Sequence, residues 1–132
     1  MTDSLESKFE KVMLIDDNTT DLYISSRMII KNNFGKEVLE YSSAREALKY
    51  LQENQENTDK LPSVLFVDIY MPLMSGFEFL EEYNKLPHIA KVFVMSSTID
   101  DSDIIRARNF QNVVSFQVKP ITKEFLNRIQ ND

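Results

Sequence analysis

Cysteine is absent from the 132-residue chain, and glycine occurs only twice, at Gly35 and Gly76. Without cysteine the protein can form neither disulfides nor thiolate metal sites, which fits a reducing compartment. With so few glycines it has no glycine-rich loop of the kind that cradles phosphate groups in nucleotide-binding proteins. These absences exclude a disulfide-stabilised fold and a glycine-rich phosphate cradle.

Long hydrophobic runs and clusters of basic residues are also missing. No apolar run approaches the ~20 residues that span a bilayer, and residues 1–6 lack the basic and apolar parts of a signal peptide. The 15 Lys and Arg residues are scattered among 21 Asp and Glu, with a net charge of −6. Direct binding to nucleic acid calls for clustered basic residues. We therefore expect a cytoplasmic protein that binds neither membranes nor nucleic acid.

The chain has the size and composition of one folded domain. It is 42% hydrophobic and includes nine Phe, so it can bury a core. Apolar strand-like runs alternate with helix-like segments, which requires crossover connections and predicts an α/β fold with a parallel sheet. We expect a single domain over residues 1–132, with its core at about 11–130 and no output domain. The predicted strands are 11–15, 37–41, 63–68, 91–96 and 114–118.

Local signals mark two helix starts and one turn. Ser43 and Glu46 have the spacing of a capping box, and Thr122 is a plausible N-cap for the last helix. Before the fifth strand, Asn109 and Asn112 are candidates for a left-handed backbone conformation.

Polar side chains stand at the carboxyl ends of four predicted strands. Asp16 and Asp17 follow the first strand, Asp68 and Ser96 end the third and fourth, and Lys119 follows the fifth. In a parallel sheet these ends meet at one edge, where ligands bind. Burying clustered carboxylates without a counter-ion costs free energy, and Mg²⁺ prefers hard oxygen ligands such as these. The pattern predicts a cation site with Asp68 as a nucleophile toward phosphorus, although each residue alone is also typical of a solvated strand end.

The segment Val67–Gly76 (Val-Asp-Ile-Tyr-Met-Pro-Leu-Met-Ser-Gly) resembles the signature around the phosphoaccepting aspartate of bacterial response regulator receiver domains. With the Asp16-Asp17 pair, Ser96 and Lys119-Pro120, the resemblance covers about residues 11–130 and is closest to stand-alone, chemotaxis-regulator-like members. It implies a flavodoxin-like, doubly wound, five-stranded parallel sheet of order 2-1-3-4-5 with five helices. It also implies a cis peptide bond between Lys119 and Pro120.

The same resemblance assigns roles to residues at the predicted site. It implies that Asp68 accepts the phosphoryl group. Mg²⁺, or Mn²⁺ in its place, is expected to be held by Asp17, Asp68 and the backbone carbonyl of Tyr70. Asp16 is expected to act mainly through water. Lys119 is expected to pair with Asp68 or with the transferred group.

Switching and readout are implied in the same way. Ser96 corresponds to the switch hydroxyl and Phe116 to the switch aromatic, with a readout face formed by the fourth helix, fifth strand and fifth helix. Tyr70 and Thr98, two residues after Asp68 and Ser96 respectively, are expected to tune hydrolysis of the acyl phosphate by controlling water access.

The expected partners of this chain are proteins, and the sequence disfavours two other functions and leaves a third open. His88 is expected to be a surface residue rather than a phosphodonor, so the phosphoryl group must come from a separate histidine kinase or histidine phosphotransfer protein, or from a small-molecule phosphodonor. The protein itself is expected to be a monomer or weak dimer. A flavin-binding redox protein is disfavoured by the charges of Asp16 and Asp17. A haloacid-dehalogenase-type phosphatase needs an aspartate where Tyr70 stands. A docking module that works without phosphorylation remains open.

Overall fold

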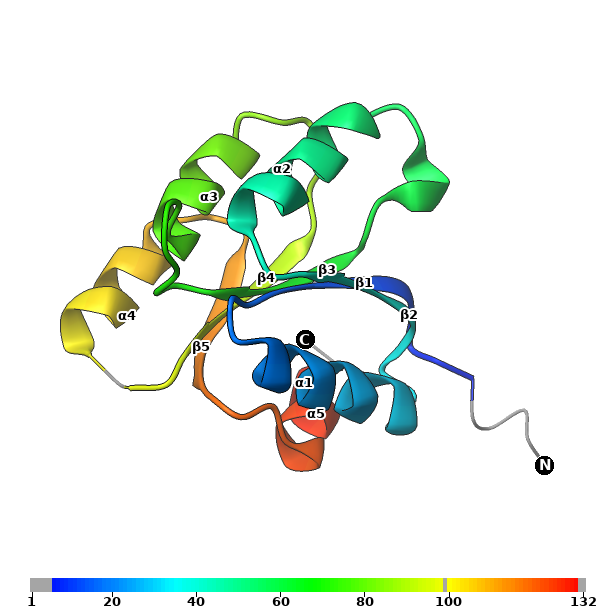
Figure 1. Ribbon diagram of the computed structural model, residues 1–132. Helices are drawn as coiled ribbons and strands as arrows, with labels where there is room; N and C mark the ends of the chain where they lie inside the picture. The colour runs from blue at the N-terminus through cyan, green and yellow to red at the C-terminus, as the bar shows by residue number, and fades with distance from the viewer. Residues whose placement is uncertain (1–5, 99, 131–132) are drawn as a thin grey trace.

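A parallel five-stranded sheet forms the centre of the computed structural model, which describes residues 6–98 and 100–130 (Figure 1). Its strand order is β2-β1-β3-β4-β5, and every neighbouring pair is parallel. This confirms the predicted flavodoxin-like architecture, and each strand begins and ends within two residues of its predicted bounds. The strands are β1 (Phe9–Ile15), β2 (Gly35–Tyr41), β3 (Val64–Asp68), β4 (Lys91–Ser96) and β5 (Val113–Val118).

Helices cover both faces of the sheet. Helices α1 and α5 pack on one face, and α2, α3 and α4 pack on the other (Figure 1). Because β3 lies in the middle and is covered on both sides, all of its residues are buried, as its apolar sequence predicts. The bounds are α1 (Thr19–Lys31), α2 (Ala44–Glu53), α3 (Gly76–Tyr83), α4 (Asp101–Arg108) and α5 (Lys123–Ile129), with a short 3-10 turn, η2, at Thr58–Lys60.

The helix starts agree in part with the sequence signals. The Thr122 hydroxyl accepts a hydrogen bond from the Phe125 N–H at 3.1 Å, which confirms it as the N-cap of α5. Ser43 caps α2, but its bond from Glu46 is long, at 3.4 Å. The complete capping box begins α3 instead, where the Ser75 hydroxyl accepts from the N–H of Glu78 and the Glu78 carboxylate accepts from the N–H of Ser75. This cap sets the end of the loop that follows β3.

The left-handed residues are not those that the sequence suggested. Among the described residues other than glycine, positive φ occurs at Asn33 (58°) and Leu73 (70°). Asn109 ends α4 in a right-handed conformation, with φ −76°, so the predicted left-handed turn at Asn109 or Asn112 is wrong. Two turn hydrogen bonds connect α4 to β5, one from the Phe110 N–H to the Ala107 carbonyl and one from the Val113 N–H to the Phe110 carbonyl. The Lys119–Pro120 bond is cis, as the resemblance implied.

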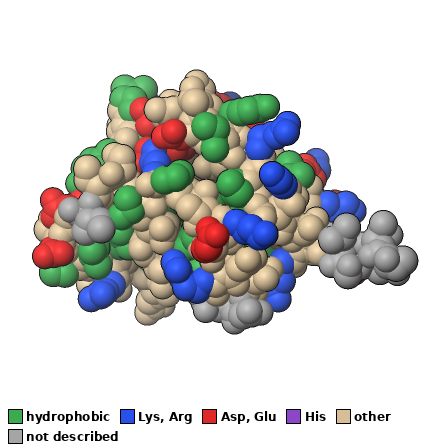
Figure 2. All heavy atoms as spheres, turned by 90° about the horizontal axis from the view of Figure 1, so that it is seen from below, with side chains coloured by type: hydrophobic (Ala, Val, Ile, Leu, Met, Phe, Trp, Pro, Cys, Tyr) green, Lys and Arg blue, Asp and Glu red, His purple; other side chains and the backbone are tan. Residues whose placement is uncertain are grey.

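Charged side chains are mixed on the surface. On the face that carries α1 and α5, Lys and Arg side chains are spread among neutral and apolar ones rather than gathered into one patch (Figure 2).

Within the described part of the chain, no helix is both long enough and apolar enough to cross a membrane.

Candidate functional site

Four strand ends converge at the carboxyl edge of the sheet and bring the predicted polar residues together. Asp16 follows β1, Asp68 is the last residue of β3 and Ser96 is the last residue of β4. Lys119 follows β5, and its N–H donates to the Ser96 carbonyl at 2.7 Å, which continues the β4–β5 pairing by one residue. The parallel register therefore decides that these side chains share one edge.

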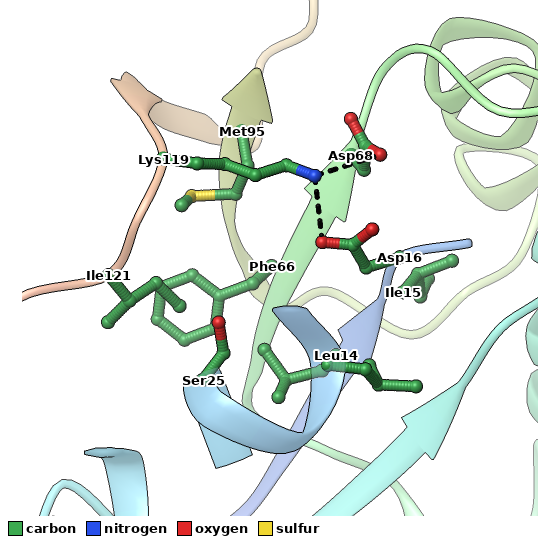
Figure 3. Close-up of a pocket in the computed structure, with 10 residues that line it drawn as sticks. Leu14, Ile15, Asp16, Ser25, Phe66, Asp68, Met95, Lys119 and Ile121 are labelled. Atoms are coloured by element: carbon green, nitrogen blue, oxygen red, sulfur yellow. Dashed lines mark hydrogen bonds and ion pairs between the residues drawn. The ribbon is translucent and has the colours of Figure 1, made fainter. Parts of the chain in front are cut away.

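The Lys119 ammonium lies at the centre of the site. The Lys119 side chain lines the same pocket as the apolar side chains of Phe66 and Ile121, and its ammonium lies between Asp68 and Asp16 (Figure 3). Its Nζ is 2.9 Å from Asp16 Oδ2 and 3.2 Å from Asp68 Oδ2. The predicted pairing of Lys119 with Asp68 is present in this arrangement, and the lysine bridges two carboxylates rather than one.

A third carboxylate near Lys119 was not anticipated from the sequence. Asp21, in the first turn of α1, lies 3.4 Å from the Lys119 Nζ through its Oδ2 atom. Its own N–H donates to the side chain of the N-cap Asn18, which holds the first turn of α1 in place beside the site. An acidic residue in a first helical turn is common because its negative charge interacts favourably with the helix dipole. The sequence therefore contained no specific signal for this contact.

The loop after β3 holds Asp68 through close backbone packing. The Gly76 N–H donates to the Ile69 carbonyl at 3.0 Å, so the start of α3 folds back on the end of β3. A Cβ atom at Gly76 would lie 2.5 Å from the Asp68 carbonyl oxygen and 2.7 Å from the Ile69 Cα. Glycine is therefore needed here for close approach of two backbone segments, and Leu73 takes up the positive φ that closes the loop.

Burial and neighbouring charge raise the proton affinity of the site. Asp68 is 5% exposed, and burial raises its pKa to about 6, with Asp16 adding to the rise and Lys119 opposing it. Burial alone would lower the pKa of Lys119, but its bonds to Asp16 and Asp68 outweigh burial and raise that pKa. The negative charge of this site is therefore only partly balanced by the one lysine.

The carboxylates form a donor set that fits a divalent cation. One oxygen each from Asp16, Asp17 and Asp68 lies within 4.8 Å of the others. Asp17 is exposed, whereas Asp16 and Asp68 are largely buried. Hard oxygen ligands beside a negative charge that is only partly balanced are what a divalent cation requires. Such an ion would oppose the effects of burial and of the Asp16 charge, which together raise the pKa of Asp68.

The remaining predicted residues surround this centre. Ser96 is fully buried, and its hydroxyl accepts from the N–H of Thr98 at 3.2 Å, while Thr98 itself is exposed. The Tyr70 N–H donates to Asp68 Oδ1 at 3.4 Å. The exposed Tyr70 phenol donates to the carboxylate of Asp103 in α4, a contact that the sequence did not reveal.

Two predicted residues lie away from the carboxylates. Phe116 is half-buried in β5 and packs against the core on the α2–α4 side, in a groove that it shares with Ile104 and Arg108. His88 lies in the loop before β4, at the opposite end of the sheet from Asp68. It was expected on the surface, but it is half-buried, with its Nε2 2.6 Å from the Pro62 carbonyl oxygen.

The sequence and the fold both match known proteins. The response regulator receiver domain family matches residues 12–130. The sensor histidine kinase CheAY of Helicobacter pylori is 31% identical over 121 residues, which cover 89% of this chain and 14% of that protein. The probable methanogenesis regulatory protein FilR2 of Methanothrix harundinacea is 24% identical over 119 residues, which cover 89% of this chain and 76% of that protein.

Solved structures agree. A two-component response regulator from Cytophaga hutchinsonii superposes with a TM-score of 0.83 at 26% identity, covering 93% of this chain and 95% of that one. A response regulator receiver protein from Dyadobacter fermentans has a TM-score of 0.75 at 28% identity, covering 90% and 96% respectively. With the family match over residues 12–130, these similarities show that the chain belongs to the response regulator receiver domain family of two-component signalling.

Proposed function

We propose that this receiver domain is a phosphoacceptor that takes a phosphoryl group from a partner's phosphohistidine onto Asp68 in a reaction that depends on Mg²⁺. The observation that carries the proposal is the position of Asp68. Its carboxylate is buried at the sheet edge, within 3.2 Å of the Lys119 ammonium and beside the acidic pair Asp16 and Asp17. A carboxylate in this position can attack phosphorus while the nearby positive charge offsets the negative charge of the phosphoryl group on the donor.

The chain's own residues would divide the work of the transfer. An Asp68 oxygen forms the new bond to phosphorus as the bond between phosphorus and the donor nitrogen breaks, and the donor histidine leaves with a proton from solvent. Lys119 lies where it can neutralise a phosphoryl oxygen once Asp68 is phosphorylated. The Ser96 hydroxyl, at the end of the neighbouring strand, can donate to another phosphoryl oxygen.

The cation would be held by Asp17, Asp68 and the backbone carbonyl of Tyr70, with Asp16 acting mainly through water. Mg²⁺ is the expected ion, and Mn²⁺ can replace it because both accept octahedral oxygen coordination. When bound, the ion supplies positive charge that offsets the charge of the transferred group.

Phosphorylation would be read on the face formed by α4, β5 and α5. Ser96 would move toward the phosphoryl group, and Phe116 would turn from its half-buried position toward the interior. Support comes from the groove beside Phe116 and from the exposed apolar side chains of Ile105 (61%) and Val114 (42%) on this face. Together with the groove, these two side chains would give a protein partner apolar area to bury.

The phosphodonor would be a sensor histidine kinase or a histidine phosphotransfer protein. His88 cannot serve within the same molecule, because it lies at the far end of the sheet from Asp68 and its ring contacts Pro62. Tyr70 and Thr98 would tune the lifetime of the acyl phosphate through the access of water.

The test is the mass of the intact protein after incubation with acetyl phosphate and Mg²⁺. We expect one phosphoryl adduct that is absent from Asp68→Asn and from a sample with chelator. An adduct that persists in Asp68→Asn would place the acceptor elsewhere. If the protein binds Mg²⁺ but acquires no adduct from acetyl phosphate or from a phosphorylated histidine kinase, the domain works as a docking module without phosphorylation.

A further inference from the structure

The Tyr70 side chain connects the loop after β3 to the first turn of α4. Its phenol hydroxyl donates a hydrogen bond to the Asp103 carboxylate, 33 residues further along the chain. Its backbone N–H donates to Asp68 Oδ1 at 3.4 Å. One residue therefore contacts the candidate phosphoacceptor through its main chain and α4 through its side chain.

Both ends of this connection rest on ordered backbone. At the α4 end, the N-cap Asp100 accepts from the N–H of Ser102 at 2.9 Å, and the N–H of Asp103 donates to the Asp100 carbonyl at 3.0 Å. At the other end, the Ile69 N–H donates to the Met95 carbonyl of β4 at 3.1 Å. A phenol that bonds to a carboxylate makes a charge-assisted hydrogen bond, which is stronger than a neutral one. The Tyr70 side chain is thus held at a defined position, although the residue is 58% exposed.

The direction of the connection places the ring beside the site. Strands β3 and β4 are neighbours, with Asp68 paired to Met95, and α4 follows β4 in the chain. A side chain that joins the residue two after Asp68 to the first turn of α4 therefore lies on the β4 side of Asp68. We infer that Asp103 is a positioning residue that holds the Tyr70 ring across this side of the entrance to Asp68. There the ring slows the approach of water and of small phosphodonors.

This inference rests on the proposed phosphorylation of Asp68. With acetyl phosphate, an Asp68 oxygen bonds to phosphorus and acetate leaves. In hydrolysis, the oxygen of water bonds to phosphorus as the bond to the Asp68 oxygen breaks. Inorganic phosphate leaves, the Asp68 carboxylate is restored, and the proton passes to solvent. Both reactions require a small molecule to reach the same atoms, so one obstruction slows both.

The experiment measures both rates in matched variants. Tyr70→Phe keeps the ring and removes the hydroxyl, Asp103→Ala removes the acceptor, and the double variant removes both. Asp101→Ala is the control, because it removes an exposed carboxylate from the same turn of α4. We expect each single variant to raise the rate of phosphorylation by acetyl phosphate and the rate of hydrolysis by about threefold, as the loss of one hydrogen bond allows.

Further comparisons separate positioning from a loss of structure. The double variant should be no faster than either single one, since both remove the same bond. Asp103→Asn keeps an oxygen acceptor and should return both rates toward wild type. A variant that merely weakened the fold would not accelerate both reactions. If the wild type forms an adduct but Tyr70→Phe and Asp103→Ala match Asp101→Ala, the positioning role is overturned and the proposed function stands. If no donor phosphorylates the wild type, both fall.

Discussion

At the scale of single residues, the site depends on how one ammonium is shared among carboxylates. The sequence predicted Lys119, Asp16 and Asp68 from their places at strand ends, and the structure brings them within hydrogen-bond distance. It could not predict Asp21, because that contact depends on how the first turn of α1 is oriented after β1. The contact of Asp103 could not be predicted for a similar reason, because Asp103 lies in α4 and its partner Tyr70 lies in the loop after β3.

Asp21 is expected to restrain reaction with anionic donors. Its carboxylate, 3.4 Å from the Lys119 Nζ, competes for the charge that a phosphoryl group would use. The Asp21→Asn variant should react with acetyl phosphate about twofold faster at low salt, and the difference should vanish near 1 M salt, where exposed charges are screened. The rate of adduct formation by intact mass measures this effect.

Asp59→Asn provides the control, because it removes an exposed acidic charge in η2 at the opposite end of the sheet. A slower reaction in Asp21→Asn, approaching that of Lys119→Ala, would contradict the prediction. It would show instead that Asp21 is needed to orient the lysine.

At the scale of elements, the loop between β3 and α3 decides where Asp68 lies. The sequence indicated the strand end and the glycine, and it contained the Ser75–Glu78 spacing of the capping box that begins α3. What it could not indicate is that Gly76 packs directly against the backbone of Asp68. That contact exists only because α3 turns back over the end of β3.

Replacement of Gly76 should disturb both stability and the site. In Gly76→Ala the new methyl meets backbone atoms at 2.5 and 2.7 Å, which cannot move without displacing Asp68. We expect a loss of about 3 kcal/mol in the free energy of unfolding and weaker Mg²⁺ binding. Urea denaturation and calorimetric titration with Mg²⁺ measure the two effects.

Gly35→Ala is the matched variant at the other glycine. There the added methyl meets the side chains of Val12 and Ile29, at 2.7 and 3.0 Å, at the amino end of β2. It should destabilise the protein by about 1–2 kcal/mol and leave Mg²⁺ binding unchanged. Equal effects of the two variants on Mg²⁺ affinity would refute a special role for Gly76.

At the scale of the whole molecule, the site and the stability of the fold are linked. Asp68 ends the central strand β3, and its neighbours at the site come from β1, β4 and β5. Burial raises the pKa of Asp68 from 3.8 to about 6, so the folded protein holds this proton more tightly than the unfolded chain. The stabilisation that follows is complete below pH 3.8 and is lost as the pH rises through about 6.

Asp68→Asn should therefore stabilise the protein at pH 7.5 in the presence of chelator, by up to about 3 kcal/mol for a shift of this size. This advantage should disappear near pH 4.

Addition of Mg²⁺ should raise the melting temperature of the wild type more than that of Asp68→Asn, because the ion binds the folded state and Asp68 is one of its proposed ligands. Thermal melts at the two pH values provide the measurement. A variant less stable than wild type in chelator at pH 7.5 would show that the ion pair with Lys119 outweighs the cost of burial.

The sequence by itself determined the architecture and the main polar residues of the site. Strand-like runs that alternate with helices permit few arrangements other than a parallel sheet, and the carboxyl ends of its strands must share an edge. The sequence alone thus assigns five residues to one site, namely Asp16, Asp17, Asp68, Ser96 and Lys119.

Only the tertiary structure decided the contacts that cross between elements. The bond from Tyr70 to Asp103, the place of Asp21 beside Lys119 and the close approach at Gly76 each join segments whose relative position depends on packing. The predicted turn at Asn109 or Asn112 was wrong, because Asn109 ends α4 in a right-handed conformation and Asn112 does not have a positive φ. Sequence patterns report which face or end of an element a residue occupies, whereas distances between elements follow from how the core packs.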